Sequence, residues 1–519
     1  MHSTTASPAF SPTPAAQARR DWSFSAKAGV AAALVAAGDW LFAGWRGGAT
    51  LGVYALLLLV ALAATGPAVL RSRAALVAGA AAAIMAVALG DDPSLLAFGL
   101  FGVAAASAAL LPRSRFHDGW RWAIRLLCHF LLAVLQPLRD WRGARRARRR
   151  RGVIGLVARL PILVLPVAGS LLFAALFASA NPLIGDAFAR IDVAGALAGL
   201  SPSRLALWAV LALAVWSLLR PPAILLAPPG VARDAIALPG VSLASVTVSL
   251  FAFNTIFAAQ NGLDLAFLWS GAPLPEGMTL AQYAHRGAYP LIATALLAAL
   301  FVLVTFRPGS DMAASPLLRR LVYLWIGQNV LLVASTMHRT LDYVDAYSLT
   351  RLRIAALLWM ALVAVGLLLI CYRIWRGRSD AWLINANLAA AALLLTGCAF
   401  VDLGAVAAGW NVRHTRDAGG RGATLDLCYL NNLGASSLLP LIQLESRPIT
   451  PELRDRVSWS REAQMARLEA QQADWRLWTF RGARRLAEAK RLVAERRLPR
   501  VAAEPRRCSG TPLTGMREG

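Results

Sequence analysis

Long apolar runs recur along the chain and restrict its fold more than any other feature. A helix needs about 20 apolar residues to cross a hydrocarbon core of about 30 Å, and runs down to about 17 residues can suffice. Runs of about this length, bounded by charge, occupy residues 28–45, 50–70, 74–90, 94–111, 153–180, 205–219, 241–259, 288–306, 321–337, 354–372 and 382–409. The sequence therefore predicts an all-α fold, a polytopic bundle of about 11 transmembrane helices followed by a partly helical C-terminal tail.

The composition agrees with a membrane protein. Charged residues make up 16% of the chain and hydrophobic residues 57%. Soluble domains carry about 25% charged residues, so this balance excludes a soluble protein, and the apolar content excludes a disordered one. The first run is too long for a signal peptide, contains Asp39 and is closely followed by a second run. We therefore expect it to be retained as a helix.

Arginine is concentrated in alternate loops between the predicted spans. One set of loops, from Arg19 to Arg378, carries most of the positive charge, whereas the opposite set holds few arginines and includes Asp91 and Asp92. Positively charged loops stay in the cytoplasm. We predict a multi-pass membrane protein with a cytoplasmic N-terminus and, for an odd number of spans, a tail after Trp410 on the outer side.

The net charge of +25 has two interpretations, nucleic acid or anionic lipid. Its densest segment, residues 139–151, holds eight arginines and one acid directly before a predicted span. Such juxtamembrane clusters bind anionic phospholipid headgroups, and nothing around this one resembles a nucleic-acid-binding fold. The arginines predicted to contact lipid are Arg142, Arg145, Arg146, Arg148, Arg149, Arg150 and Arg151. We expect residues 120–138 to form a helix that lies in the membrane interface.

These patterns divide the chain into six parts. They are a disordered N-terminus (1–25), a four-span unit (26–112), the arginine-rich segment (113–152), a seven-span core (153–410), a short outer segment (411–445) and a tail (446–519). Residues 450–500 alternate acids, arginines, Leu and Trp. This alternation predicts a charged helix or helical hairpin, either solvated or adsorbed on lipid, with a protein partner as the alternative. The last residues contain Pro505, Gly510 and Pro512, and we expect them to be disordered.

Polar residues that the topology assigns to the outer face form the candidate site. They are Gln260, Asp264, Tyr283, Arg286, Arg339, Asp342, Asp345, Tyr347, Thr350, Arg351, Asn411 and Asp426. Ionisable groups near a bilayer are costly to leave facing lipid, so they indicate a polar cavity. The simpler alternative is that they only staple the outer loops together. We expect Arg351 to pair with Asp342 or Asp345, and Arg353 to reach headgroups.

Signatures of soluble enzymes are absent from the sequence. It contains no phosphate-binding loop, no GxSxG and no HExxH, and its six histidines are too scattered for a metal site. We therefore expect no cofactor and no metal. The five cysteines form no CxxC pair, and Cys428 and Cys508 could pair if the tail is periplasmic.

Several elements near the outer face occur in a characteristic order. They are Gln260, YAHRG at residues 283–287, YSLTRLR at residues 347–353, NVR at residues 411–413 and LDLCYL at residues 425–430. Over about residues 159–441 this series resembles the bacterial membrane family called domain of unknown function 4173 and its sibling 4153. The chain departs from the family pattern at His285, where Arg is usual, and at Ser348, where Gly is usual. The resemblance implies a multi-pass inner-membrane protein and supplies no catalytic residue.

Two classes of function remain. The first is a non-enzymatic membrane protein, either transporter-like, sensory or envelope-organising, whose outer cluster binds a small molecule or a partner. The second is an interfacial enzyme acting on lipid-linked or anionic material, with His338, Asp342 or Asp345 as acid or base and nearby arginines holding the anion. The sequence favours the first, because it shows no nucleophile, metal set or cofactor motif.

Overall fold

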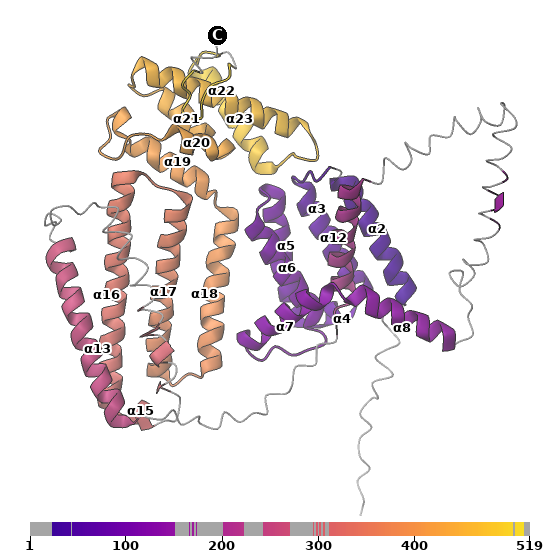
Figure 1. Cartoon of the computed structure of the whole chain (residues 1–519), viewed down its shortest axis with the longest axis horizontal. Coiled ribbons are helices and arrows are strands. Elements are labelled where there is room, and N and C mark those ends of the chain that lie inside the picture. The colour runs from indigo at the N-terminus through magenta and orange to yellow at the C-terminus, as the bar shows by residue number, and fades with distance from the viewer. Residues whose placement is uncertain are drawn as a thin grey trace, which may run out of the picture. The chain divides into compact units, whose positions relative to one another are not determined.

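The computed structural model describes residues 23–42, 44–150, 201–222, 242–269, 311–501 and 504–512, with some residues in 166–173 and 294–306. Throughout these residues the secondary structure is helical, apart from one isolated bridge between Arg506 and Pro512. The chain divides into two compact units. The first comprises residues 1–87, 98–115 and 124–226, and the second comprises residues 88–97, 116–123 and 227–519 (Figure 1).

Six described helices are long and apolar enough to cross a membrane. They are α5 (Arg73–Asp91), α12 (Pro202–Leu219), α13 (Leu243–Asp264), α16 (Pro316–Tyr347), α17 (Arg351–Arg376) and α18 (Asp380–Phe400). A seventh span is obtained if the bent pair formed by residues 119–133 and 136–143 is counted as one. These helices confirm a helical membrane protein, while the count of about 11 stays a prediction. The runs expected at 153–180 and at 288–306 are each described only in part.

One expected span is shorter than its apolar run. The run at 382–409 is divided into α18, which ends at Phe400, and α19 (Leu403–His414). The division occurs because Asp402 is in an extended conformation and its side chain accepts a hydrogen bond from the Ala405 N–H at 2.9 Å, so it caps a new helix. A span that was expected to be continuous therefore ends nine residues earlier than residue 409.

The first unit contains α2 (Phe24–Phe42), α3 (Thr50–Thr65), α4 (Ala68–Arg71), α8 (Gln136–Arg150) and α12, together with most of α5 and of α6 (Leu95–Leu110). Asp39 lies within an apolar helix, and Arg204 of α12 pairs with it at 2.8 Å. This ion pair explains how α2 carries a carboxylate.

The arginine-rich segment is helical and begins after a sharp bend. α7 (Gly119–Ala133) and α8 meet at 67°. Arg142 and Arg146 are exposed on α8, whereas the side chains of Arg145, Arg148, Arg149 and Arg150, and all of Arg151, lie outside the described part.

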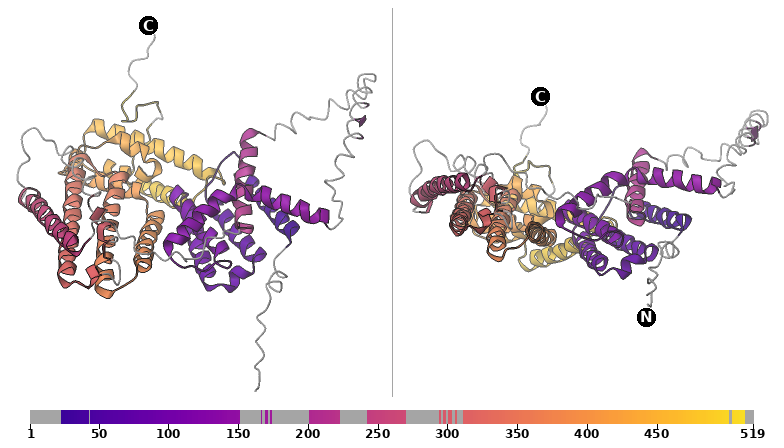
Figure 2. Two further views of the ribbon diagram at one scale, coloured as in Figure 1. Left: turned by 60° about the horizontal axis from the view of Figure 1, so that its bottom comes forward. Right: turned by 90° about the horizontal axis from the view of Figure 1, so that it is seen from below.

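In the second unit α13, α16, α17 and α18 stand side by side, and α19 to α23 lie across one end of α16, α17 and α18 (Figure 1). The left view in Figure 2 shows the same arrangement. An aromatic cluster of Phe253, Phe301 and Trp325 joins α13 to α16, with centroids 5.2 to 5.6 Å apart. This aromatic packing holds α13 against α16.

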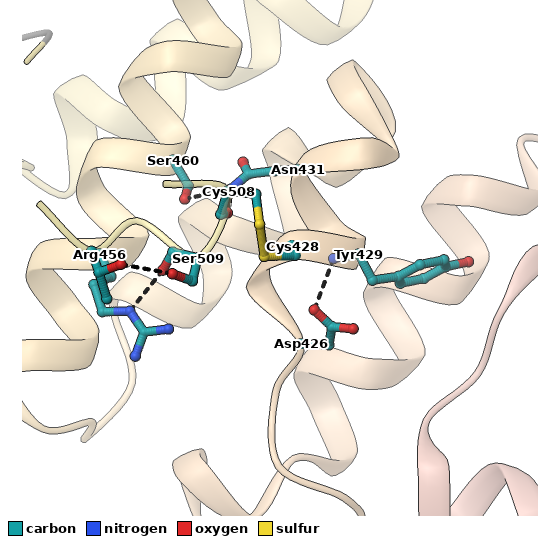
Figure 3. The surroundings of a disulfide bond; sticks show 9 residues. Asp426, Cys428, Tyr429, Asn431, Arg456, Ser460, Cys508 and Ser509 are labelled. Carbon is teal, nitrogen blue, oxygen red and sulfur yellow. Dashed lines mark hydrogen bonds between the residues drawn. A yellow bond between two sulfur atoms is a disulfide. The ribbon is translucent and has the colours of Figure 1, made fainter. Parts of the chain in front are cut away.

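The C-terminal helices form a small domain with its own core. It comprises α19, α20 (Leu427–Asn432), α21 (Leu438–Glu445), α22 (Pro451–Ala473) and α23 (Phe480–Glu495), and we call residues 402–512 the C-terminal domain. A disulfide joins Cys428 of α20 to Cys508 (Figure 3). The Asn431 amide donates to the Cys508 carbonyl at 2.7 Å and holds the same segment in place.

The predicted helical hairpin at 450–500 is present, but it is packed rather than solvated. Arg461 is fully buried on α22, where its guanidinium bonds Glu445 of α21 at 2.7 Å and the Pro499 carbonyl at 2.6 Å. Residues 504–512, which we expected to be disordered, are ordered against α20 and α22 through the disulfide and a bond from Arg456 to the Ser509 carbonyl. The charge pattern misled the prediction because a buried ion pair has the same residue types as a solvated face.

Candidate functional site

A three-residue turn joins α16 to α17 at the end that faces the C-terminal domain. The Thr350 hydroxyl accepts from the Arg353 N–H at 3.3 Å and caps α17. Ser348 has φ +69° and ψ 161°, a conformation that favours glycine. The turn therefore has a glycine-type conformation although serine occupies the position.

Arg353 secures the turn from the α17 side. Its guanidinium donates to the Tyr347 carbonyl at 2.7 Å and also to the Ser348 carbonyl. The same guanidinium lies 4.3 Å from the centroid of the Tyr343 ring. These carbonyls follow the end of α16, where backbone oxygens lack helical partners and a positive charge is favourable. Arg353 is thus a capping residue, and the expectation that it reaches headgroups stays a prediction.

Side chains of the C-terminal domain form hydrogen bonds to the turn from the other side. The Asn411 side chain of α19 accepts from the Leu349 N–H at 2.7 Å and donates to the Leu349 carbonyl at 2.9 Å. Both residues are buried. The Tyr429 hydroxyl of α20 accepts from the Arg351 N–H at 2.9 Å. We call residues 347–353, together with Asn411 and Tyr429, the docking turn.

Asp426 affects the turn indirectly, through Tyr429. Its carboxylate accepts from the Tyr429 N–H at 2.9 Å and caps α20, which orients Tyr429 (Figure 3). Three elements of the sequence pattern, at 347–353, 411 and 425–430, therefore meet in one structure.

Asp402 is the centre of a second polar group next to the docking turn. Its carboxylate accepts from the Ser436 hydroxyl at 2.8 Å and from Arg485 of α23 at 2.5 Å. Burial alone would raise the pKa of Asp402, but the hydrogen bond from the Ala405 N–H, the nearby charge of Arg485 and the hydroxyl of Ser436 together lower it. This carboxylate ties α18, α19 and α23 together.

Arg351 belongs to the same group. Its guanidinium donates to the Ser436 hydroxyl at 3.4 Å and lies against Gly404, where an added side chain would collide with it. The expected ion pair of Arg351 with Asp342 or Asp345 is wrong, because the side chain points to α19 rather than back along α16. Asp342 instead lies 3.2 Å from His338, and Asp345 is exposed.

A polar seam runs between α13 and α16. Asp264 and Arg339 form a buried ion pair, and the Gln260 amide donates to the same carboxylate at 3.0 Å. Farther along, the Gln328 amide donates to Asn254 at 2.9 Å. Among the described residues, four buried oxygens of this seam have no hydrogen-bond partner. They are Asn261 Oδ1, Asp264 Oδ2, Gln328 Oε1 and Asn329 Oδ1.

The structure therefore distributes the candidate residues over two places. Tyr347, Thr350, Arg351, Asn411 and Asp426 gather at the docking turn, whereas Gln260, Asp264 and Arg339 lie in the seam. Tyr283 and Arg286 lie outside the described residues. No cluster of three metal-ligating side chains occurs in the part of the chain that the structure describes.

Sequence reasoning missed Asp402, Ser436 and Arg485. A signal for Asp402 was present, because an acid followed by a small-residue run inside an apolar stretch is typical of a helix N-cap. Ser436 and Arg485 carry no comparable signal, since they reach Asp402 from distant parts of the chain.

Helices that are long and apolar enough to cross a bilayer define a membrane protein. The family model described as domain of unknown function (DUF4153) matches residues 74–444, well over half of the 519 residues. The chain belongs to this family. The resemblance to family 4173 stays a prediction. No curated protein and no solved structure matches the chain.

Proposed function

We propose that the protein is a non-enzymatic envelope component, sensory or organising, whose membrane helices hold the C-terminal domain in a fixed orientation through the docking turn. One observation supports this proposal most strongly. Three polar side chains of the sequence pattern bond to the backbone of one turn: Asn411 to Leu349, Tyr429 to Arg351, and Arg353 to Tyr347 and Ser348. Side chains engaged in this way position a domain and are not available to a substrate.

The arrangement in the membrane is part of the proposal. We infer about 11 spans in a bacterial inner membrane, a cytoplasmic N-terminus and a periplasmic C-terminal domain. The disulfide between Cys428 and Cys508 supports the periplasmic side, because disulfides persist in oxidising compartments. Exposed Arg142 and Arg146 on α8 would then contact anionic headgroups in the cytoplasmic leaflet, and the periplasmic domain would meet a protein partner.

Cysteine labelling tests this topology. In a variant whose free cysteines Cys128, Cys371 and Cys398 are replaced by serine, one new cysteine is placed at exposed Arg142 or at exposed Asp345. A membrane-impermeant thiol reagent applied to intact spheroplasts should label position 345 and spare position 142. The reverse pattern would overturn the arrangement.

A transporter-like role is the second candidate, and the seam favours it. Unpartnered buried oxygens between membrane helices are typical of a path for ions or water. The enzyme alternative has less support, since His338 and Asp342 pair with each other and Arg339 is engaged by Asp264.

Complementation distinguishes these functions. A deletion strain is profiled for lipids, sugars, metabolites and envelope integrity, and variants are compared at equal abundance in the membrane. Under our proposal Asn411→Leu and Tyr429→Phe lose complementation, whereas His338→Gln and Asp342→Asn retain it. Loss with the second pair alone would support an enzyme, and loss with Asp264→Asn alone would support transport.

A further inference from the structure

The disulfide and one contact of the docking turn are carried by neighbouring residues of a single short helix. α20 has six residues, and Cys428 near its start is joined to Cys508 (Figure 3). The next residue, Tyr429, accepts a hydrogen bond from the Arg351 N–H of the turn at 2.9 Å. Because both connections belong to one short helix, a change at Cys428 alters the orientation of Tyr429.

Residues 504–512, which we call the C-terminal strap, are fastened to the domain by the disulfide and by polar contacts. The Trp459 indole N–H donates to the Glu504 carbonyl at 2.8 Å, and the Arg456 guanidinium donates to the Ser509 carbonyl at 2.7 Å. Within the strap a glycine is the only buried residue. The strap therefore adds no buried apolar side chain to the core of the domain.

The order of the strap depends on the disulfide. Fixing the backbone of a residue costs at least as much free energy as an exposed hydrogen bond returns. The disulfide joins residues 80 positions apart, and a cross-link of this kind restricts the unfolded chain. Without it we expect the strap to leave α22. Asn431 of α20 would then lose the Cys508 carbonyl, to which it donates at 2.7 Å.

The two halves of the disulfide differ in accessibility. Cys508 is exposed, whereas Cys428 is half-buried. Exposed disulfides are more readily reduced by thiols than buried ones, so an attacking thiolate reaches Cys508 first. The C-terminal domain contains no third cysteine, so neither released thiol has another partner in the domain.

We propose that Cys428 and Cys508 are a site of thiol–disulfide exchange with a dithiol protein on the outer side of the membrane. The disulfide keeps α20 in the orientation that the docking turn requires. This inference rests on the function proposed above for the docking turn. The oxidised form thus holds the C-terminal domain firmly, and the reduced form loosens it.

The exchange takes place in two steps. One thiolate of the dithiol attacks Cys508 Sγ and displaces the Cys428 thiolate, which takes up the proton that the attacking thiol lost. The second thiol of the dithiol then attacks its own sulfur in the mixed disulfide and releases Cys508 as a thiol. Two electrons pass from the dithiol to the protein, and the reverse reaction restores the disulfide.

Hydrogen exchange of the purified full-length protein in detergent tests the proposal. The parent carries serine in place of the three free cysteines, so only Cys428 and Cys508 react. Reduced thioredoxin, used as the dithiol protein, should reduce the pair under native conditions, as measured by alkylation of the new thiols. Exchange in peptides covering residues 347–353 should then accelerate about tenfold, the change expected for one lost hydrogen bond. Exchange of residues 321–337 within α16 should stay unchanged.

Two variants separate this inference from the proposed function. Tyr429→Phe should accelerate exchange of residues 347–353 in both redox states, and reduction should add little to it. Cys428→Ser/Cys508→Ser should exchange like the reduced parent and should not respond to thioredoxin. The reduction of the parent keeps the test valid if this double variant does not fold.

The outcomes that would overturn each idea are different. No change in exchange with Tyr429→Phe would mean that α20 does not hold the turn, and the proposed function would fail. Faster exchange with Tyr429→Phe but not on reduction of the parent would overturn the redox inference alone. A disulfide that thioredoxin reduces only after denaturant is added would also overturn it.

Discussion

Replacing Asn411 with leucine tests the docking turn most directly, because leucine keeps the volume and removes both hydrogen bonds. The substitution leaves the N–H and the carbonyl of Leu349 without partners in a buried position, with Leu349 7% exposed. A buried backbone group left unsatisfied costs about 1 to 3 kcal/mol. The two groups can relax partly toward water, so we expect a loss of about 2 to 4 kcal/mol.

Thermal unfolding of the purified protein in detergent measures this loss. For a folding unit of this size about 1 kcal/mol corresponds to about 2 to 4 °C, so Tm should fall by roughly 4 to 16 °C. Asn432→Ala, at an exposed position on α20, is the matched control and should change Tm by less than about 2 °C. If Asn411→Leu behaves like this control, the docking turn does not hold the domain and the reasoning fails.

Three further perturbations follow from the same geometry. Arg353→Ala should lower the free energy of unfolding by about 1 to 3 kcal/mol, because Arg353 bonds two carbonyls of the turn. Arg351→Ala should lower it by less than about 1 kcal/mol, because exposed Arg351 makes one long contact. Equal losses of stability in the two variants would refute this prediction. Ser348→Gly should raise Tm by the equivalent of about 1 kcal/mol by relieving a positive φ, and a lower Tm would contradict it. Because the folded-state pKa of Asp402 is lowered, its stabilising contribution is present above the unfolded value of about 3.9 and is lost as pH falls through the lower folded-state pKa. The Tm of the wild type should therefore fall on acidification below about pH 5, and Asp402→Asn should be less stable at pH 7 with a flatter pH profile.

The membrane helices could be predicted from the sequence because apolar length is a local property. The runs at 241–259, 321–337 and 354–372 correspond to α13, α16 and α17, whose ends differ by several residues. Such differences arise because helices continue past the apolar run while their polar residues find partners, as Asp264 and Arg339 do in the seam. Local patterns do not contain that information.

The candidate site could be predicted as a set of residues but not as a set of contacts. Tyr347, Thr350, Arg351 and Asn411 were grouped by sequence, and the structure brings them together. The predicted pairing of Arg351 was wrong because its partner Ser436 lies outside its own loop, 85 positions further along the chain. The buried pair of Arg461 and Glu445 was missed for the same reason, since burial depends on α21 packing against α22.

The turn at Ser348 explains why the sequence pattern is typical of a family and yet indicates no activity. A serine at φ +69° carries strain of about 1 to 3 kcal/mol, which persists only where the surroundings fix the conformation. Those surroundings are the bonds from Arg353, Asn411 and Thr350, each worth about 1 kcal/mol, and together they can offset that strain. The pattern thus specifies how a turn is held against a domain, so it predicts the attachment of the C-terminal domain, whereas the function depends on surfaces that the pattern does not include.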